Sequence, residues 1–149
     1  MSQWTQVSGS IRIDGLVGLG GTTDESIKRA ITTALGPTAT FDGPRDIWER
    51  KDKTPTGSEG GIRHEYIVTA DDPHSASRGV VVLTGSLRDY GEDEYAEIVE
   101  WLNRVFAGEP SKEKPYFVRQ GSVELIIEGT KTVLLVWSGK NSRFEEHVI

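Results

Sequence analysis

The fold is decided by residues 79–106, which read GVVVLTGSLRDYGEDEYAEIVEWLNRVF. Their first part, 79–85, is a short apolar run, and such a run predicts a strand buried in a sheet. From about Glu92 to Phe106 apolar residues recur at helical spacing, which predicts an amphipathic helix. The polar motif Arg88-Asp89-Tyr90 lies between the two, so a candidate functional loop connects a strand to a helix.

The N-terminal part of the chain repeats the order strand, loop, helix. Alternating apolar and polar residues predict a strand that ends at a glycine-rich turn over residues 15–21. Thr22 and Glu25 have the spacing of a capping box, which marks the start of a helix. An apolar stripe at helical spacing follows, and Gly36-Pro37 ends this predicted helix.

Three further strands complete the pattern. One is predicted over residues 62–69, and the last two form a predicted hairpin, 117–128 and 132–138. Residues 140–149 are polar and are expected to form a loose tail, so the predicted domain spans residues 1–139.

The order β-α-β-β-α-β plus one hairpin strand predicts an α+β fold, a ferredoxin-like split-βαβ sandwich. Both helices would cover one face of an antiparallel sheet of about five strands. An α+β fold with another strand order is the alternative. In either case the helical stripes are expected to face apolar strand residues, which are Ile11, Ile13, Val81, Leu83 and Leu125.

Composition narrows the classes of function. The chain has 149 residues, enough for one domain with its own core, and it has no cysteine, which excludes disulfides, thiolate metal sites and a cysteine nucleophile. A net charge of −6 argues against binding an extended nucleic acid. No signal peptide is visible at the N-terminus, and the apolar runs are too short to span a bilayer.

The predicted topology brings two glycine-bearing motifs together. The strand at 62–69 starts at the end of the sheet where the strand at 79–85 finishes, so residues 57–61 are expected beside residues 88–91. The long connection 37–56 reaches the same end. The candidate ligand-binding residues gathered there are Arg88, Asp89, Tyr90, Ser58, Glu59, Gly60 and Trp48.

These residues suit an anionic ligand, but they also suit a turn. Arg88 offers a planar cation to a phosphate or carboxylate, and glycine-rich backbone offers N–H groups. Against this, Asp89 and Glu92 have capping-box spacing, which is a purely structural role. We weigh the two interpretations of the motif equally.

A catalytic centre is not predicted. The three histidines, His64, His74 and His147, have no metal-ligand spacing, and residues 15–21 lack the spacing of a phosphate-binding glycine motif. Glu59 is the one carboxylate worth testing as a base. The sequence therefore predicts a non-enzymatic protein without a cofactor. Trp101, beside an acidic helix face, is either a partner anchor or the edge of the core.

The motifs together resemble a group of small phage accessory proteins. The matching segments, which span most of the chain, are Trp4-Thr5-x-Val7, Ser10-Ile11-Arg12-x-Asp14, Gly57-Ser58-Glu59-Gly60, Gly85-x-Leu87-Arg88-Asp89-Tyr90 and Val118-Arg119-Gln120-Gly121. The resemblance implies a phage gene product that acts in the cytoplasm of its bacterial host and is dispensable for virion structure.

Two hypotheses of function follow, with a third ranked last. The first is a counter-defence protein that binds and sequesters a small nucleotide-type signal. The second is an inhibitor that binds a host defence protein through an acidic face or a sheet edge. The third is an enzyme acting on nucleotides with Glu59 or His64 as base. The strand 132–137 is apolar on both faces, which predicts a homodimer or a cover formed by the tail.

Overall fold

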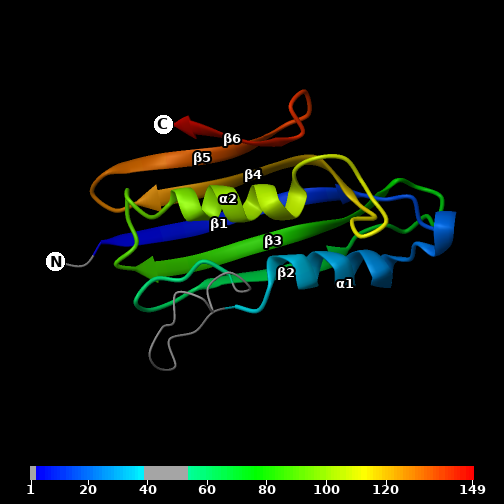
Figure 1. Ribbon diagram of the computed structural model, residues 1–149, viewed down its shortest axis with the longest axis horizontal. Coiled ribbons are helices and arrows are strands. Elements are labelled where there is room, and N and C mark those ends of the chain that lie inside the picture. The colour runs from blue at the N-terminus through cyan, green and yellow to red at the C-terminus, as the bar shows by residue number, and fades with distance from the viewer. Residues whose placement is uncertain (1–2, 39–53) are drawn as a thin grey trace.

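The computed structural model describes residues 3–38 and 54–149, and these form one α+β unit (Figure 1). The elements in chain order are β1 (Trp4–Asp14), a 3₁₀ turn (Leu19–Gly21), α1 (Asp24–Leu35), β2 (Ile62–Val68), β3 (Ser77–Arg88), α2 (Ala96–Phe106), β4 (Phe117–Ile127), β5 (Lys131–Ser138) and β6 (Arg143–Val148). No helix among the described residues is long and apolar enough to cross a membrane.

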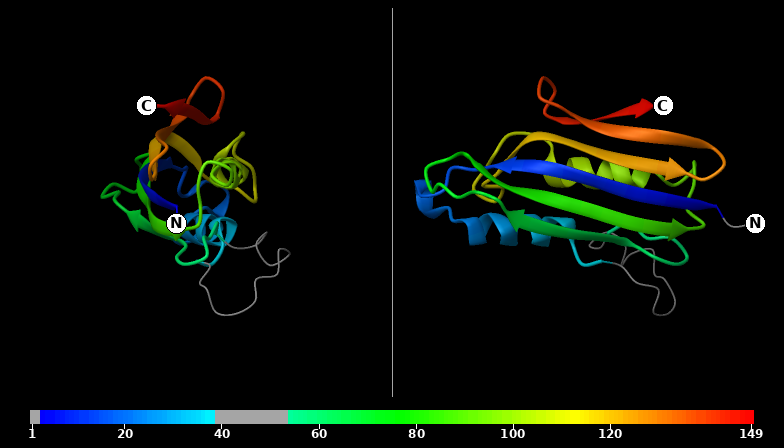
Figure 2. Two further views of the ribbon diagram at one scale, coloured as in Figure 1. Left: turned by 90° about the vertical axis from the view of Figure 1, so that its left-hand side faces the viewer. Right: turned by 180° about the vertical axis from the view of Figure 1, so that it is seen from behind.

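All six strands belong to one antiparallel sheet in the order β2-β3-β1-β4-β5-β6. The long strands β3, β1 and β4 form its centre, and β2 and β6 are its edges. Both helices lie on the same side of the sheet, as the end-on view in Figure 2 shows. The opposite face carries no described helix, and we call it the open face.

The predicted ferredoxin-like sandwich of about five strands is wrong. The sheet has six strands, and its order continues beyond β4 through β5 to β6. The extra strand comes from residues 140–149, which were expected to be a loose tail. The α+β class, the antiparallel sheet and the placement of both helices on one face are as predicted.

The C-terminal strand forms because one aromatic ring anchors it. Phe144 is 1% exposed and makes edge-to-face contacts with Phe106 of α2 and Trp137 of β5. Asn103 of α2 also binds the backbone of Phe144. Its side chain accepts a hydrogen bond from Phe144 N–H at 2.7 Å and donates one to Phe144 O at 3.3 Å. Strand β5 is therefore not an edge, and the apolar strand that motivated a dimer is covered by its own chain.

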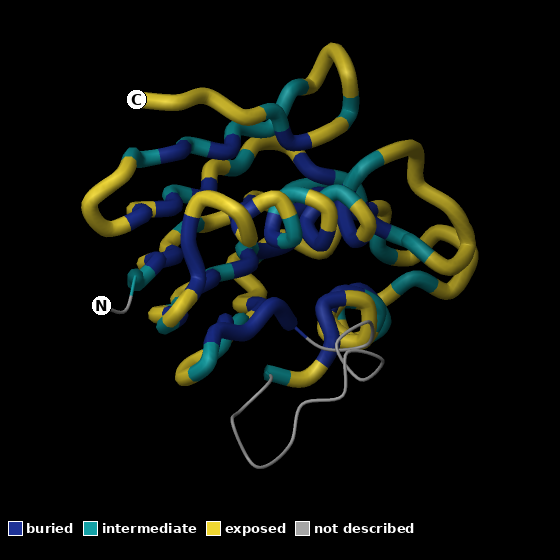
Figure 3. Tube along the Cα trace, turned by 60° about the vertical axis from the view of Figure 1, so that its left-hand side comes forward, coloured by how far each residue is buried: buried dark blue, intermediate teal, exposed yellow. Residues whose placement is uncertain are grey.

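The core lies between the helices and the sheet (Figure 3). Ile31 of α1 and Leu102 of α2 are fully buried, and so are the five strand residues that were expected to face the helices. Trp101 is also buried, and its indole N–H donates a hydrogen bond to Leu35 O at 3.0 Å. Trp101 thus joins the two helices, and its interpretation as a partner anchor is wrong.

The helix starts differ slightly from the predicted ones. The capping box of α1 is formed by Thr23 and Ser26, one residue along from the predicted Thr22, and Ser26 N–H donates to Thr23 Oγ1 at 3.0 Å. Helix α2 begins at Ala96 rather than near Glu92. The intervening residues form turns, and the Glu94 carboxylate accepts a hydrogen bond from Gly91 N–H at 2.8 Å.

Candidate functional site

The two glycine-bearing motifs do meet at one end of the sheet. Ser58 N–H donates to Arg88 O at 2.7 Å, and Arg88 N–H donates to Glu59 O at 3.0 Å. The loop closes on itself through Gly57 N–H and Gly60 O at 3.1 Å. The predicted contact between residues 57–61 and Arg88 is confirmed, and it is a backbone pairing that extends the β2–β3 ladder.

Glycine is required at both Gly57 and Gly60, because a Cβ at either position would collide with a backbone oxygen of β3. A Cβ on Gly57 would lie 2.2 Å from Arg88 O, closer than any side chain can approach a backbone oxygen. Gly60 has φ of 76°, a left-handed conformation that side chains disfavour. The glycines of the motif therefore have a packing role that needs no ligand.

The side chains of the motif also contact one another. Arg88 Nη1 forms an ion pair with Glu59 Oε1 at 2.8 Å, and Ser58 Oγ donates a hydrogen bond to Asp89 Oδ2. Both members of the ion pair are exposed to solvent, so it adds about 0.2–1 kcal/mol to stability. These contacts favour the structural interpretation of the Arg88 motif over a ligand site.

Tyr90 and Trp48 complete the predicted set. Tyr90 is 2% exposed, its N–H donates to Gln3 O at 3.1 Å, and its hydroxyl donates to Glu97 Oε2 at 3.2 Å. Tyr90 is thus a core residue at the end of β3. Trp48 lies outside the described residues.

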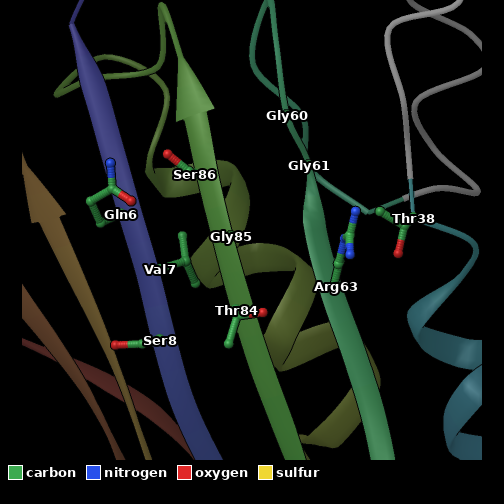
Figure 4. Close-up of a pocket in the computed structure, with 10 residues that line it drawn as sticks. All are labelled: Gln6, Val7, Ser8, Thr38, Gly60, Gly61, Arg63, Thr84, Gly85 and Ser86. Carbon is green, nitrogen blue, oxygen red and sulfur yellow. The ribbon is translucent and has the colours of Figure 1, made fainter.

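A pocket lies beside this loop, on the open face of the sheet (Figure 4). Its volume is about 600 Å³. Strands β1, β2 and β3, the Gly60-Gly61 backbone and Thr38 after α1 surround it. The lining residues are Gln6, Val7, Ser8, Thr38, Gly60, Gly61, Arg63, Thr84, Gly85 and Ser86. One of them is an arginine and none is an acid.

The strand register explains why these residues gather. Thr84 of β3 pairs with Ser8 on one side and with Arg63 on the other, so the three lie in a row across the strands. Alternate strand residues share a face, so Gln6 and Ser86 join the row on the open side. The side chains of Ser8, Thr84 and Ser86 are short, and the glycines have none, which leaves a hollow where larger residues would fill the face.

Arg63 is the cation of this pocket. It is exposed, and no carboxylate among the described residues lies within ion-pair distance of it. Figure 4 shows its side chain beside Thr38. Its neighbour His64 has a different role, because His64 Nε2 is hydrogen-bonded to Gly36 O at 2.6 Å, which ties β2 to the end of α1.

The sequence interpretation missed Arg63 and the small polar residues of β1 and β3. A signal for them exists, since every second residue of the first strand from Gln6 to Arg12 is polar. What the sequence did not reveal is that no described helix covers the face they occupy, beside a glycine loop. Among the described residues no group of three or more His, Asp or Glu is placed to hold a metal ion.

Comparisons with protein-family models, with curated proteins and with solved structures found no match to this chain.

Proposed function

We propose that this chain is a non-enzymatic binding protein that sequesters a small nucleotide-type anion in the open-face pocket. The observation that carries the proposal is the charge of the lining. The whole chain has a net charge of −6, yet the ten lining residues include Arg63 and no acid. The positive charge of Arg63 in this lining favours an anionic group over a cationic one at that point of the pocket.

The pocket's chemistry matches the parts of a nucleotide. The Arg63 guanidinium can donate two parallel hydrogen bonds to a phosphate. The hydroxyls of Ser8 and Thr84 and the amide of Gln6 suit ribose and base edges, which both donate and accept hydrogen bonds. The volume of about 600 Å³ falls within the range of small-molecule sites, roughly 300–1,000 Å³.

The biological setting is part of the same proposal. We place the protein in the cytoplasm of a bacterial host, as a phage counter-defence protein that removes a nucleotide signal by binding it. The alternative is inhibition of a host protein through the acidic face formed by Glu94, Glu97 and Glu100, or through a sheet edge. The acidic face has less support. Glu97 already accepts a hydrogen bond from Tyr90 and Glu94 one from Gly91, so two of these acids serve the fold.

The test is calorimetric titration with a panel of 5′-mononucleotides and cyclic mononucleotides. We expect at least one to bind the wild-type chain, and Arg63→Ala to weaken that binding at least tenfold. Arg29→Ala, which removes an exposed arginine on α1, is the matched control and should bind as the wild type does. Equal binding by Arg63→Ala and wild type, or no binding of any nucleotide, would refute the proposed function.

A further inference from the structure

A second hollow lies on the open face, further along β1. Its lining residues are Ser10, Arg12, Gln120, Gly121 and Ser122, from β1 and β4. The polar side of β1 connects it to the first pocket, because Ser8 lines one and Ser10 the other. The two hollows therefore lie next to each other on one face.

The second hollow is too small to be a complete site. Its volume is about 210 Å³, below the range of roughly 300–1,000 Å³ that holds a small ligand. Its lining again contains one arginine, Arg12, and no acid. No carboxylate among the described residues forms an ion pair with Arg12. A hollow of this kind suits one charged end of a ligand whose main part lies elsewhere.

The sheet geometry fixes how far apart the two arginines are. Arg63 lies level with Ser8, two strands away, and Arg12 lies four residues further along β1. With about 3.4 Å per residue and about 4.8 Å between strands, their Cα atoms are roughly 17 Å apart. Each arginine lines its own hollow, so the two arginines would hold two different anionic groups.

Two acids flank the space between the arginines. Glu124 of β4 pairs with Ser8, and Glu65 of β2 lies opposite Val82, the neighbour of Ser10, so both belong to the open face. Negative charges there repel any anionic group over Ser8 and Ser10. They disfavour a continuous polyanion such as a nucleic-acid strand and favour an uncharged, hydroxyl-bearing middle.

We infer that the ligand carries two phosphate groups separated by a ribose, one at Arg63 and one at Arg12, with sugar hydroxyls over Ser8 and Ser10. This is the chemistry of a dinucleotide. The inference rests on the proposed function, since it extends the same site along β1 and assigns Arg12 as a residue that distinguishes dinucleotides from mononucleotides.

The experiment compares cyclic diadenylate and cyclic diguanylate with AMP and GMP by calorimetry. We expect at least one dinucleotide to bind the wild type at least tenfold more tightly than the matching mononucleotide. Arg12→Ala should remove this advantage while leaving mononucleotide affinity within about twofold. Arg63→Ala should weaken both classes, and Arg29→Ala should change neither. Circular dichroism of each variant checks that it is folded.

The outcomes separate the inference from the function on which it rests. Mononucleotide binding that depends on Arg63, with no tighter binding of a dinucleotide or no effect of Arg12→Ala, overturns the inference and leaves the proposed function standing. Failure of all four probes and of the wider mononucleotide panel overturns both. Tighter binding of a ten-residue oligoadenylate than of either dinucleotide would contradict the role of Glu65 and Glu124.

Discussion

Gly57 is a residue at which the loop before β2 packs tightly against the end of β3. Because a Cβ there would meet Arg88 O at 2.2 Å, we expect Gly57→Ala to displace the backbone pairing and to lower the free energy of unfolding by about 1–3 kcal/mol. Gly139→Ala is the control, since a Cβ at Gly139 meets nothing within 4 Å. Urea denaturation measures both, and equal stability of the two variants would show that the loop is not packed this tightly.

Asp24 and Arg78 form the best-defined ion pair of the described residues. The guanidinium contacts both carboxylate oxygens, at 2.9 and 2.7 Å, and Arg78 Nη1 also donates to Asp72 O and Ser75 O. The hydrogen bonds from Arg78 lower the pKa of Asp24 below its usual value of 3.8. The pair thus fastens the β2–β3 turn to the start of α1.

The lowered pKa gives a pH dependence with a definite sign. The unfolded chain binds a proton at Asp24 more readily than the folded chain, so the pair's stabilisation is complete above pH 3.8 and is lost as the pH falls through the lowered value. We expect Asp24→Asn to be less stable than wild type near pH 6 and the difference to shrink below pH 3.8. A constant difference from pH 6 to pH 2.5, measured by urea denaturation, would contradict this account.

At the scale of elements, β6 is the edge strand that extends the sheet beyond β5. Phe144 fills the space between α2 and β5, so Phe144→Ala should leave a cavity and cost about 3–5 kcal/mol of unfolding free energy. Val148→Ala removes a residue of the same strand that is 60% exposed, and it should cost far less. Thermal melts of the two variants compare them directly, and similar melting temperatures would show that β6 does not anchor through Phe144.

Most elements could be predicted because their apolar residues repeat with a clear period. The stripes of α1 and α2 and the alternation in β1 mark both the element and the face it buries. Strand β6 has no such pattern, since Phe144 is its one fully buried side chain among charged neighbours. Its pairing with β5 is a long-range contact that local periodicity does not encode.

The candidate site could likewise be predicted only in part. The meeting of the 57–61 loop with Arg88 follows from strand order, and the sequence predicted it. Whether this contact binds a ligand could not be predicted from the sequence. The ion pair between Arg88 and Glu59 and the hydrogen bond between Ser58 and Asp89 form only in the folded loop. The open-face pocket depends on which face of the sheet the two helices cover, and that is a property of the packed domain.

At the scale of the whole molecule, the two faces of the sheet have different roles. The covered face packs the apolar core against α1 and α2 and provides the stability. On the open face β1 places the exposed residues Gln6, Ser8, Ser10 and Arg12 in a row, with hollows on either side. The division leaves the open face available for binding.

The central claim is that a nucleotide binds on the open face around Arg63, and amide chemical-shift mapping by NMR tests it most directly. The uniformly ¹⁵N-labelled chain is titrated with the nucleotide that binds most tightly in calorimetry. We predict that the largest shifts fall on amides of β1, β2 and β3 that line the pocket, including Ser8, Arg63 and Thr84, and that Arg88→Ala leaves this pattern intact. Shifts confined to residues 57–59 and 88–90, or to α2, would contradict the account.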